Sequence, residues 1–155
     1  MALILLIADQ ISKWWILTVF DLPAKYSVSI LPFLNFTMVW NEGISMGLFS
    51  EGGESGRWLL IILTTIISFV VLRWLFQNTK KTVALALGAI LGGAIGNIID
   101  RIIHGAVADF IHLHAFESSF YVFNVADAAI SIGVVVLLID GLKNENESLT
   151  TDKND

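Results

Sequence analysis

Four long apolar segments make up most of this chain and limit its possible folds. A membrane-spanning helix needs roughly 20 mostly apolar residues, and the segments that approach this length are residues 2–20, 58–77, 82–103 and 124–142. Charged residues make up only 15% of the chain, whereas a soluble domain carries about 25%. We therefore predict an all-α membrane protein, a bundle of four transmembrane helices.

The connections between these segments predict a topology. The turn at residues 78–81 is so short that the second and third helices must be antiparallel neighbours, and four spans place this turn and both termini on one side. That side collects Arg73, Lys80, Lys81 and Lys143. By the positive-inside rule the termini are cytoplasmic, and residues 21–56 and 104–123 form loops on the outer side.

The loop at residues 21–56 is long for a connection. Its stretch 26–40 is rich in strand-forming residues, so we predict a small β-rich extracytoplasmic lobe on the outer leaflet. We treat residues 1–143, this loop included, as a single membrane domain. Residues 144–155 are polar and predict a disordered cytoplasmic tail. The apolar N-terminus lacks the basic region of a cleaved signal peptide, so we expect a retained helix.

Composition excludes several kinds of chemistry. The chain has no cysteine, which excludes disulfides, thiolate metal sites and cysteine catalysis. No basic patch predicts a nucleic-acid partner. His112 and His114 could share one strand face, but no third metal ligand accompanies them. We predict no metal and no cofactor.

Ionisable residues inside membrane spans are costly and mark functional sites or buried pairs. In this chain they are Asp9, Lys13, Asp100, Arg101, Asp127 and Asp140. Asp9 and Lys13 lie four residues apart on the first helix and predict an ion pair. An alternative is that Lys13 reaches a substrate carbonyl. Asp140, near the cytoplasmic end of the fourth helix, needs no special role.

A row of small residues runs along the third segment and ends in a polar cluster. The row is made of Gly88, Gly92, Gly96 and Asp100. Its glycines let another helix approach closely. Asn97 and Arg101 lie beside Asp100, near the outer end. A purely structural network, in which Arg101 pairs with a carboxylate, is an equally good interpretation of Asp100.

Two further acids are predicted to meet at the outer interface. Asp109 follows the third helix and Asp127 opens the fourth. Two neighbouring carboxyl groups cannot both ionise cheaply, so one keeps its proton and the pair can act as acid and base. This is the chemistry of an aspartic protease. The alternative for Asp127 is that it caps its helix or interacts favourably with the helix dipole.

Other function classes stay open at this point. Residues 43–47 match the G-x-S-x-G pattern, but a nucleophilic Ser45 would need a strand–turn–helix context in an α/β sheet. A transporter or proton channel would carry polar residues along the whole bundle. A scaffold protein would use the glycine row for docking and would tolerate substitution of Asp109 and Asp127.

The chain resembles the lipoprotein signal peptidase (signal peptidase II) family of intramembrane aspartic proteases from residue 9 to about residue 142. The matching blocks, in chain order, are residues 9–13, 41–43, 45–47, 92–101, 105–110 and 123–127. Ile44 and Ser45 differ from the alanines common in the family. Only eight residues precede the first block, so we expect either a start upstream of Met1 or an unusually short first span.

The resemblance implies a role for each matched residue. Asp109 and Asp127 would be the catalytic pair, with Asn97, Arg101 and Asn124 as polar site residues. The residues that would support the substrate site are Asp9, Lys13, Asn41, Gly43 and Asp100. The expected substrate is a diacylglyceryl-modified prolipoprotein, cut before its lipidated cysteine in the bacterial inner membrane. We expect a monomer in contact with membrane lipid, sensitive to globomycin-type antibiotics.

Overall fold

The computed structural model describes residues 1–43, 53–115 and 118–151 of the chain. Its elements, in order, are α1 (Ala2–Trp14), the π-helical turn η1 (Trp15–Val19), α2 (Leu22–Lys25), β1 (Ser27–Leu31), β2 (Leu34–Asn41), α3 (Gly53–Gln77), α4 (Lys81–His104), β3 (Val107–Ala115), β4 (Ser118–Phe123) and α5 (Val125–Thr151). Four helical segments, α1 with η1, α3, α4 and α5, are long and apolar enough to cross a membrane. The predicted four-helix architecture is therefore confirmed.

Helix α4 is the centre of the bundle and contacts α1, α3 and α5. Of an 18-residue apolar stretch of α4, 61% of the residues are buried, against 17% of such a stretch in each of the other three spans. The glycines of α4 explain how two other helices can cover it so closely. A Cβ atom on Gly92 would lie 2.5 Å from the carbonyl oxygen of Ala2, and one on Gly93 would lie 2.5 Å from that of Ala126. The small residues of α4 thus seat α1 on one side and α5 on the other.

The strands form one antiparallel sheet in the order β1-β2-β3-β4. Only β1 and β2 were predicted, because residues 104–123 were interpreted as an outer loop. They instead contribute β3, which pairs with β2, and β4, which pairs with β3. Strand pairing across distant segments depends on tertiary contacts that local sequence does not show. Ile16 and Leu22 pack with Met38, Ala108 and Phe110 to join the sheet to the end of the first span.

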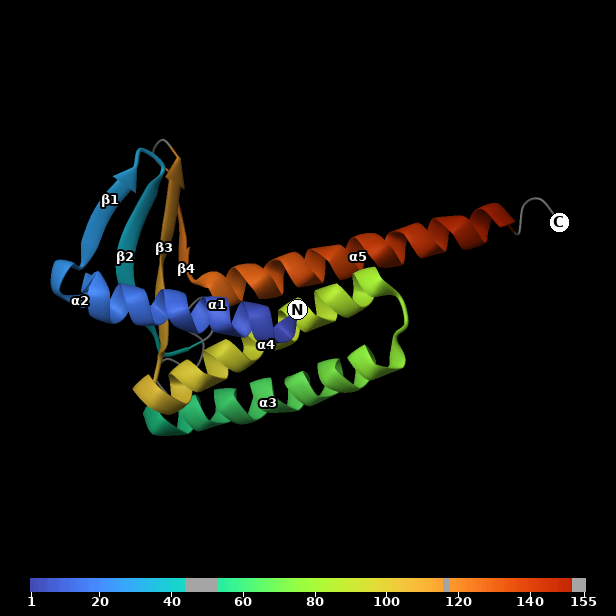
Figure 1. Cartoon of the computed structure of the whole chain (residues 1–155), viewed down its shortest axis with the longest axis horizontal. Coiled ribbons are helices and arrows are strands. Elements are labelled where there is room, and N and C mark those ends of the chain that lie inside the picture. The colour runs from blue at the N-terminus through green and yellow to red at the C-terminus, as the bar shows by residue number, and fades with distance from the viewer. Residues whose placement is uncertain (44–52, 116–117, 152–155) are drawn as a thin grey trace.

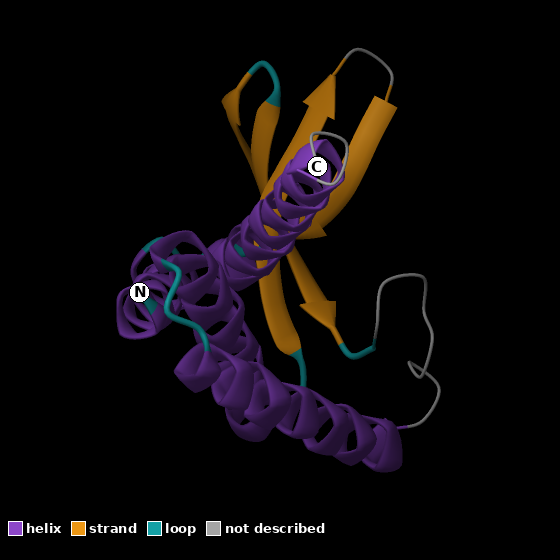
Figure 2. Cartoon of the chain, turned by 90° about the vertical axis from the view of Figure 1, so that its right-hand side faces the viewer, coloured by secondary structure: helices purple, strands orange, loops and turns teal. Residues whose placement is uncertain are grey.

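The sheet lies at one end of the helices, where α1 and α4 end and α3 and α5 begin (Figure 1). The turn between α3 and α4 and the end of α5 lie at the opposite end. A view along the helices shows the strands behind α5 (Figure 2). Helix α5 continues to Thr151, so residues 144–151 are helical where the sequence predicted a disordered tail. Extending an existing helix requires no new nucleus, and this explains the difference.

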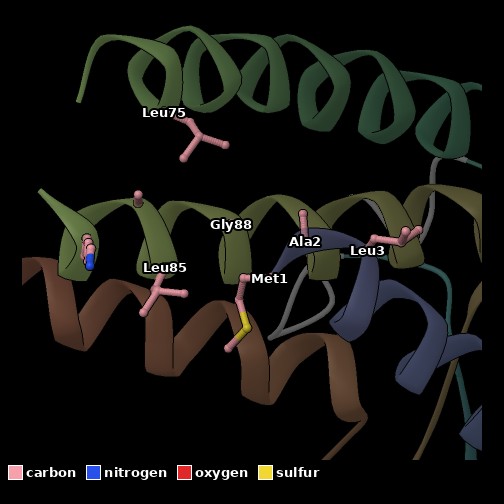
Figure 3. Close-up of a pocket in the computed structure, with 8 residues that line it drawn as sticks. Met1, Ala2, Leu3, Leu75, Leu85 and Gly88 are labelled. Carbon is pink, nitrogen blue, oxygen red and sulfur yellow. The ribbon is translucent and has the colours of Figure 1, made fainter. Parts of the chain in front are cut away.

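A mainly apolar cavity of about 480 Å³ opens at the end of the bundle away from the sheet. It lies where α1 begins beside Gly88, between the end of α3 and the start of α4 (Figure 3). Leu75, Leu85 and the side chain of Met1 line it, with Lys81 among its lining residues. None of the acids predicted to form the catalytic site lines this cavity.

Candidate active site

Asp109 is the third residue of β3, and only 2% of it is exposed. Its two carboxylate oxygens accept hydrogen bonds from two asparagine side chains. Asn41 Nδ2, at the end of β2, donates to Oδ2 across 3.0 Å. Asn124 Nδ2, just before α5, donates to Oδ1 across 2.6 Å. These bonds satisfy a carboxyl group that burial would otherwise leave without partners.

Asp127 lies in the first turn of α5 and is joined to the residue that caps this helix. Its backbone N–H donates to Asn124 Oδ1 across 2.9 Å, and its carboxylate Oδ2 accepts the N–H of Asn124 across 3.3 Å. This reciprocal arrangement is a capping box. The other carboxylate oxygen accepts a hydrogen bond from Asn97 Nδ2 at 2.8 Å. Capping therefore uses one oxygen of Asp127, and the second faces the polar cluster.

Asp109 and Asp127 line the same cavity, which has a volume of about 550 Å³. The other lining residues come from three elements: Asn41, Phe120, Tyr121, Val122, Phe123, Ala128, Ile130, Ser131 and Ile132. The structure thus brings together the two acids that the sequence predicted as a pair. They come from a strand and a helix, so neither can shift without disturbing the sheet or the bundle.

Burial raises the pKa of Asp109 from its ordinary value of 3.8 to about 7, and the nearby Asp127 carboxyl adds to this rise. The hydrogen bonds from Asn41 and Asn124, and the positive charge of Lys13, act in the opposite direction. Asp109 can therefore keep its proton at a pH where an ordinary aspartate is ionised. A carboxyl group with this property can serve as a general acid at physiological pH.

Lys13 is at the centre of a buried ionic network next to the two acids. Its Nζ atom lies 2.8 Å from Asp9 Oδ2 and 2.9 Å from Asp100 Oδ2, and the Lys13 side chain is 3% exposed. It also donates to Asn97 Oδ1 across 3.1 Å. The predicted Asp9–Lys13 ion pair is confirmed. Since Asn97 bonds in turn to Asp127, the network reaches the candidate catalytic pair.

Each acid of this network also holds the backbone next to one of the paired aspartates. Asp9 Oδ1 accepts the N–H of Ala126 at 2.9 Å, directly before Asp127. Asp100 Oδ2 accepts the N–H of Ala108 at 3.1 Å, directly before Asp109. Asp100 thus has the structural role that the sequence left open. Lys13, by bridging Asp9 and Asp100, ties the start of α5 to β3.

Arg101 holds the backbone just after β2 next to the site. Its Nη2 atom donates to the carbonyl oxygen of Gly43 at 3.2 Å, and the N–H of Gly43 donates to Asn41 Oδ1 at 3.2 Å. Within the described residues no ion pair joins Arg101 to a carboxylate, contrary to the pairing considered from the sequence. The physical reason is that Lys13 already neutralises Asp100, so backbone carbonyls receive the guanidinium group.

Three residues considered from the sequence and one that was not lie near or outside the site. Ser45 lies outside the described residues. His112 and His114 stand on β3 with ring centroids 6.0 Å apart. The sequence did not single out Gln10, whose side chain donates to Asp9 Oδ2 and Asp100 Oδ1 at 3.1 Å each. A polar residue in an apolar span next to Asp9 was a signal that could have found it.

Comparisons with known proteins show the family of this chain. The family described as "Signal peptidase (SPase) II" matches residues 1–143. A lipoprotein signal peptidase from Beijerinckia indica is 46% identical over 93% of this chain and 86% of its own length. Another, from Methylobacterium radiotolerans, is 47% identical over 92% of this chain and 84% of its own length.

Solved structures give the same result at the level of the fold. Two structures described as bacterial membrane enzymes superpose with TM-scores of 0.78 each, at 30% and 32% sequence identity. The first covers 94% of this chain and 87% of its own, and the second covers 92% and 90%. With its four apolar helices, the chain is a multi-pass membrane protein. It belongs to the signal peptidase II family, whose curated members are named lipoprotein signal peptidases.

Proposed function

We propose that this chain is an intramembrane aspartic endopeptidase that removes the signal peptide from diacylglyceryl-modified prolipoproteins, cutting before the lipidated cysteine. Membership of the signal peptidase II family makes it a peptidase that processes lipoprotein precursors. The observation that carries the aspartic chemistry is the pair Asp109 and Asp127 on one cavity, with the pKa of Asp109 raised to about 7. Such a pair supplies one acid and one base at neutral pH.

The proposed reaction balances without a metal or a cofactor. Asp127, in the first helical turn where the dipole favours negative charge, takes a proton from a water molecule. The water oxygen attacks the scissile carbonyl carbon while Asp109 gives its proton to the carbonyl oxygen. The tetrahedral diol then collapses: Asp127 protonates the departing nitrogen, the C–N bond breaks, and a diol hydroxyl returns a proton to Asp109.

The proposed setting is the bacterial inner membrane, with both termini in the cytoplasm and the sheet at the outer face. Exposed aromatic residues near the cavity support this placement, because Phe120 and Tyr121 on β4 are 65% and 64% exposed. Aromatic rings of this kind gather at the level of lipid head groups. A diacylglyceryl group anchored in the outer leaflet would then hold the scissile bond at the depth of the two acids. We propose that the enzyme works as a monomer.

The distribution of polarity weighs against a transport function. A channel would carry buried polar residues along the whole bundle. Among the described residues the buried polar and charged side chains are Asp9, Lys13, Asn97, Asp100, Arg101, Asp109 and Asn124. All belong to the single network around the site, whereas the cavity at the other end is mainly apolar.

The test is cleavage of a diacylated precursor peptide by the purified protein in detergent. Asp109→Asn and Asp127→Asn are each expected to lower kcat by at least about 10³-fold, because each removes one partner of the acid–base pair. Asp140→Asn is the matched control, since Asp140 lies in the same helix as Asp127 but pairs with Lys80. Wild-type activity should survive a chelator. Full activity in either site variant would refute the proposal.

A further inference from the structure

Strand β4 is an edge of the sheet, and it lines the active-site cavity. In the described part of the chain β4 pairs with β3 and ends the strand order. Four consecutive residues of β4, residues 120–123, line the cavity. The same cavity touches Asn41 on β2 and Asp109 on β3, so it extends from the two acids across the sheet to β4 at its edge.

An edge strand offers hydrogen-bonding groups that no other strand of its own sheet uses. In an antiparallel pair, alternate residues direct their N–H and C=O groups away from the partner strand. On β4 these groups belong to a strand that lines the cavity. The four residues span roughly 13 Å at about 3.3 Å each. Asn124 follows the last residue of β4 in the chain, and its side chain is hydrogen-bonded to both Asp109 and Asp127.

The opposite wall of the cavity is part of α5. It is formed by Ala128, Ile130, Ser131 and Ile132. Most of these side chains are apolar, and Ile132 is 63% exposed. The cavity thus has a polar backbone edge on one side and an apolar helix face on the other. An extended peptide fits this combination, with its backbone toward β4 and apolar side chains toward α5.

The chemistry of cleavage also requires an extended peptide. In a helix each carbonyl is hydrogen-bonded inside the segment, so a helical signal segment must unwind before two carboxyl groups can reach one amide. Unwinding frees backbone N–H and C=O groups, and at the level of the membrane each unsatisfied group is costly. The edge of β4 would supply partners for these groups at the place where the chain must unwind.

We propose that the residues flanking the scissile bond bind to the free edge of β4 as an added fifth strand. This inference rests on the proposed function and specifies how the substrate is held. Main-chain hydrogen bonds would give affinity without demanding a particular sequence, and the wall of α5 would favour small or apolar side chains. Strand addition to an exposed edge is an established mode of peptide recognition.

The test is an N-methyl scan of a diacylated peptide substrate. Each amide in the six positions around the scissile bond, except the scissile amide itself, is methylated in turn. Because strand pairing uses every second residue, kcat/KM should fall at least tenfold at alternate positions and less than threefold at those between. Uniform effects, or none, would overturn the proposal and would indicate that the cavity receives lipid chains or side chains only.

A protein variant provides the second arm. Val122 and Phe123 pair in regular register with His112 and Ile111. Neighbouring residues of such a strand direct their N–H groups to opposite sides, so only one of Val122→Pro and Phe123→Pro removes a donor from the free edge. That variant should keep its melting temperature and lose at least tenfold in kcat/KM. Ile30→Pro on β1, an exposed position at the other edge, is the matched control. Wild-type kcat/KM in both β4 variants would overturn the proposal.

The design separates the two hypotheses. If the unmethylated substrate is not cleaved, or is cleaved equally by Asp109→Asn, the proposed function fails. If it is cleaved in an Asp109-dependent way but the scan shows no alternation, only the strand addition fails. The scan is read on the wild-type protein, so it decides the question even where a proline variant does not fold.

Discussion

Asn124 donates its side-chain amide to the Asp109 carboxylate across 2.6 Å. The carbonyl oxygen of the same side chain accepts the N–H of Asp127 and so caps α5. One asparagine therefore sets the position of both candidate catalytic acids. Its amide is suited to this task because it has a donor and an acceptor at fixed positions.

Exchanging Asn124 for a residue that can only cap separates these two roles. Serine is as good a helix cap as asparagine, but its short hydroxyl cannot span from the cap to Asp109. We expect Asn124→Ser to keep most of the stability and to lower kcat about 10²-fold or more. Asn124→Ala should lose the same activity and about 1 kcal/mol of stability as well. Unfolding in detergent and peptide cleavage measure the two effects; normal cleavage by Asn124→Ser would contradict the positioning role.

The raised pKa of Asp109 predicts how stability depends on pH. Between its ordinary pKa of 3.8 and the folded value of about 7, the folded chain holds a proton that the unfolded chain has released. Stability must therefore fall as pH rises through this range, by up to about 1.4 kcal/mol per pH unit from this group, and must level off above pH 7. Melting of the wild type and of Asp109→Asn in detergent should show a difference that follows this curve. Parallel curves would contradict it.

The same titration predicts the alkaline limit of activity. If Asp109 is the general acid, the active fraction falls about tenfold for each pH unit above 7. The logarithm of kcat should therefore decline with slope near −1 on the alkaline side. A profile that is flat to pH 9 would show that Asp109 does not need its proton.

Removing the hub of the buried network should destabilise the bundle. Lys13→Met leaves Asp9 and Asp100 buried without their cation, which costs about 3–5 kcal/mol. Lys80→Met is the control, because the Lys80–Asp140 pair is partly exposed at its lysine and such pairs contribute about 0–1 kcal/mol. Reversible unfolding in mixed detergent compares the two. Adding Asp9→Asn and Asp100→Asn to Lys13→Met should recover part of the lost stability. Equal losses of stability in Lys13→Met and Lys80→Met would show that the network does not stabilise the bundle.

The glycine row gives a prediction about packing. A Cβ atom on Gly96 would lie 2.5 Å from Asp9 Oδ2, whereas one on Gly141 meets nothing within 4 Å. Gly96→Ala should therefore displace Asp9 from the N–H of Ala126, lowering both stability by about 2 kcal/mol and activity at least tenfold. Gly141→Ala should be neutral or stabilising by up to about 1 kcal/mol. Activity of Gly96→Ala equal to that of Gly141→Ala would contradict this packing.

Part of this site was accessible to sequence reasoning because its signals are local. Hydropathy over about 20 residues predicts the spans, and the four-residue spacing of Gly88, Gly92 and Gly96 predicts a close helix contact. The cost of charge in lipid marks Asp9, Lys13 and Asp100 as special. The prediction that Asp109 and Asp127 meet followed from topology, since both lie at the same ends of neighbouring spans.

Local properties of the chain are enough to predict four apolar membrane-spanning helices with two acids near one end of them. The groups that those acids and their neighbours contact are set by the folded arrangement. Asp9 and Ala126 are 117 residues apart and Lys13 and Asn97 are 84 apart, and β3 and β4 exist as strands because β2 is beside them. The physical reason is that hydropathy and periodicity are properties of a short stretch of chain, whereas hydrogen bonds and strand pairing depend on what packing brings alongside.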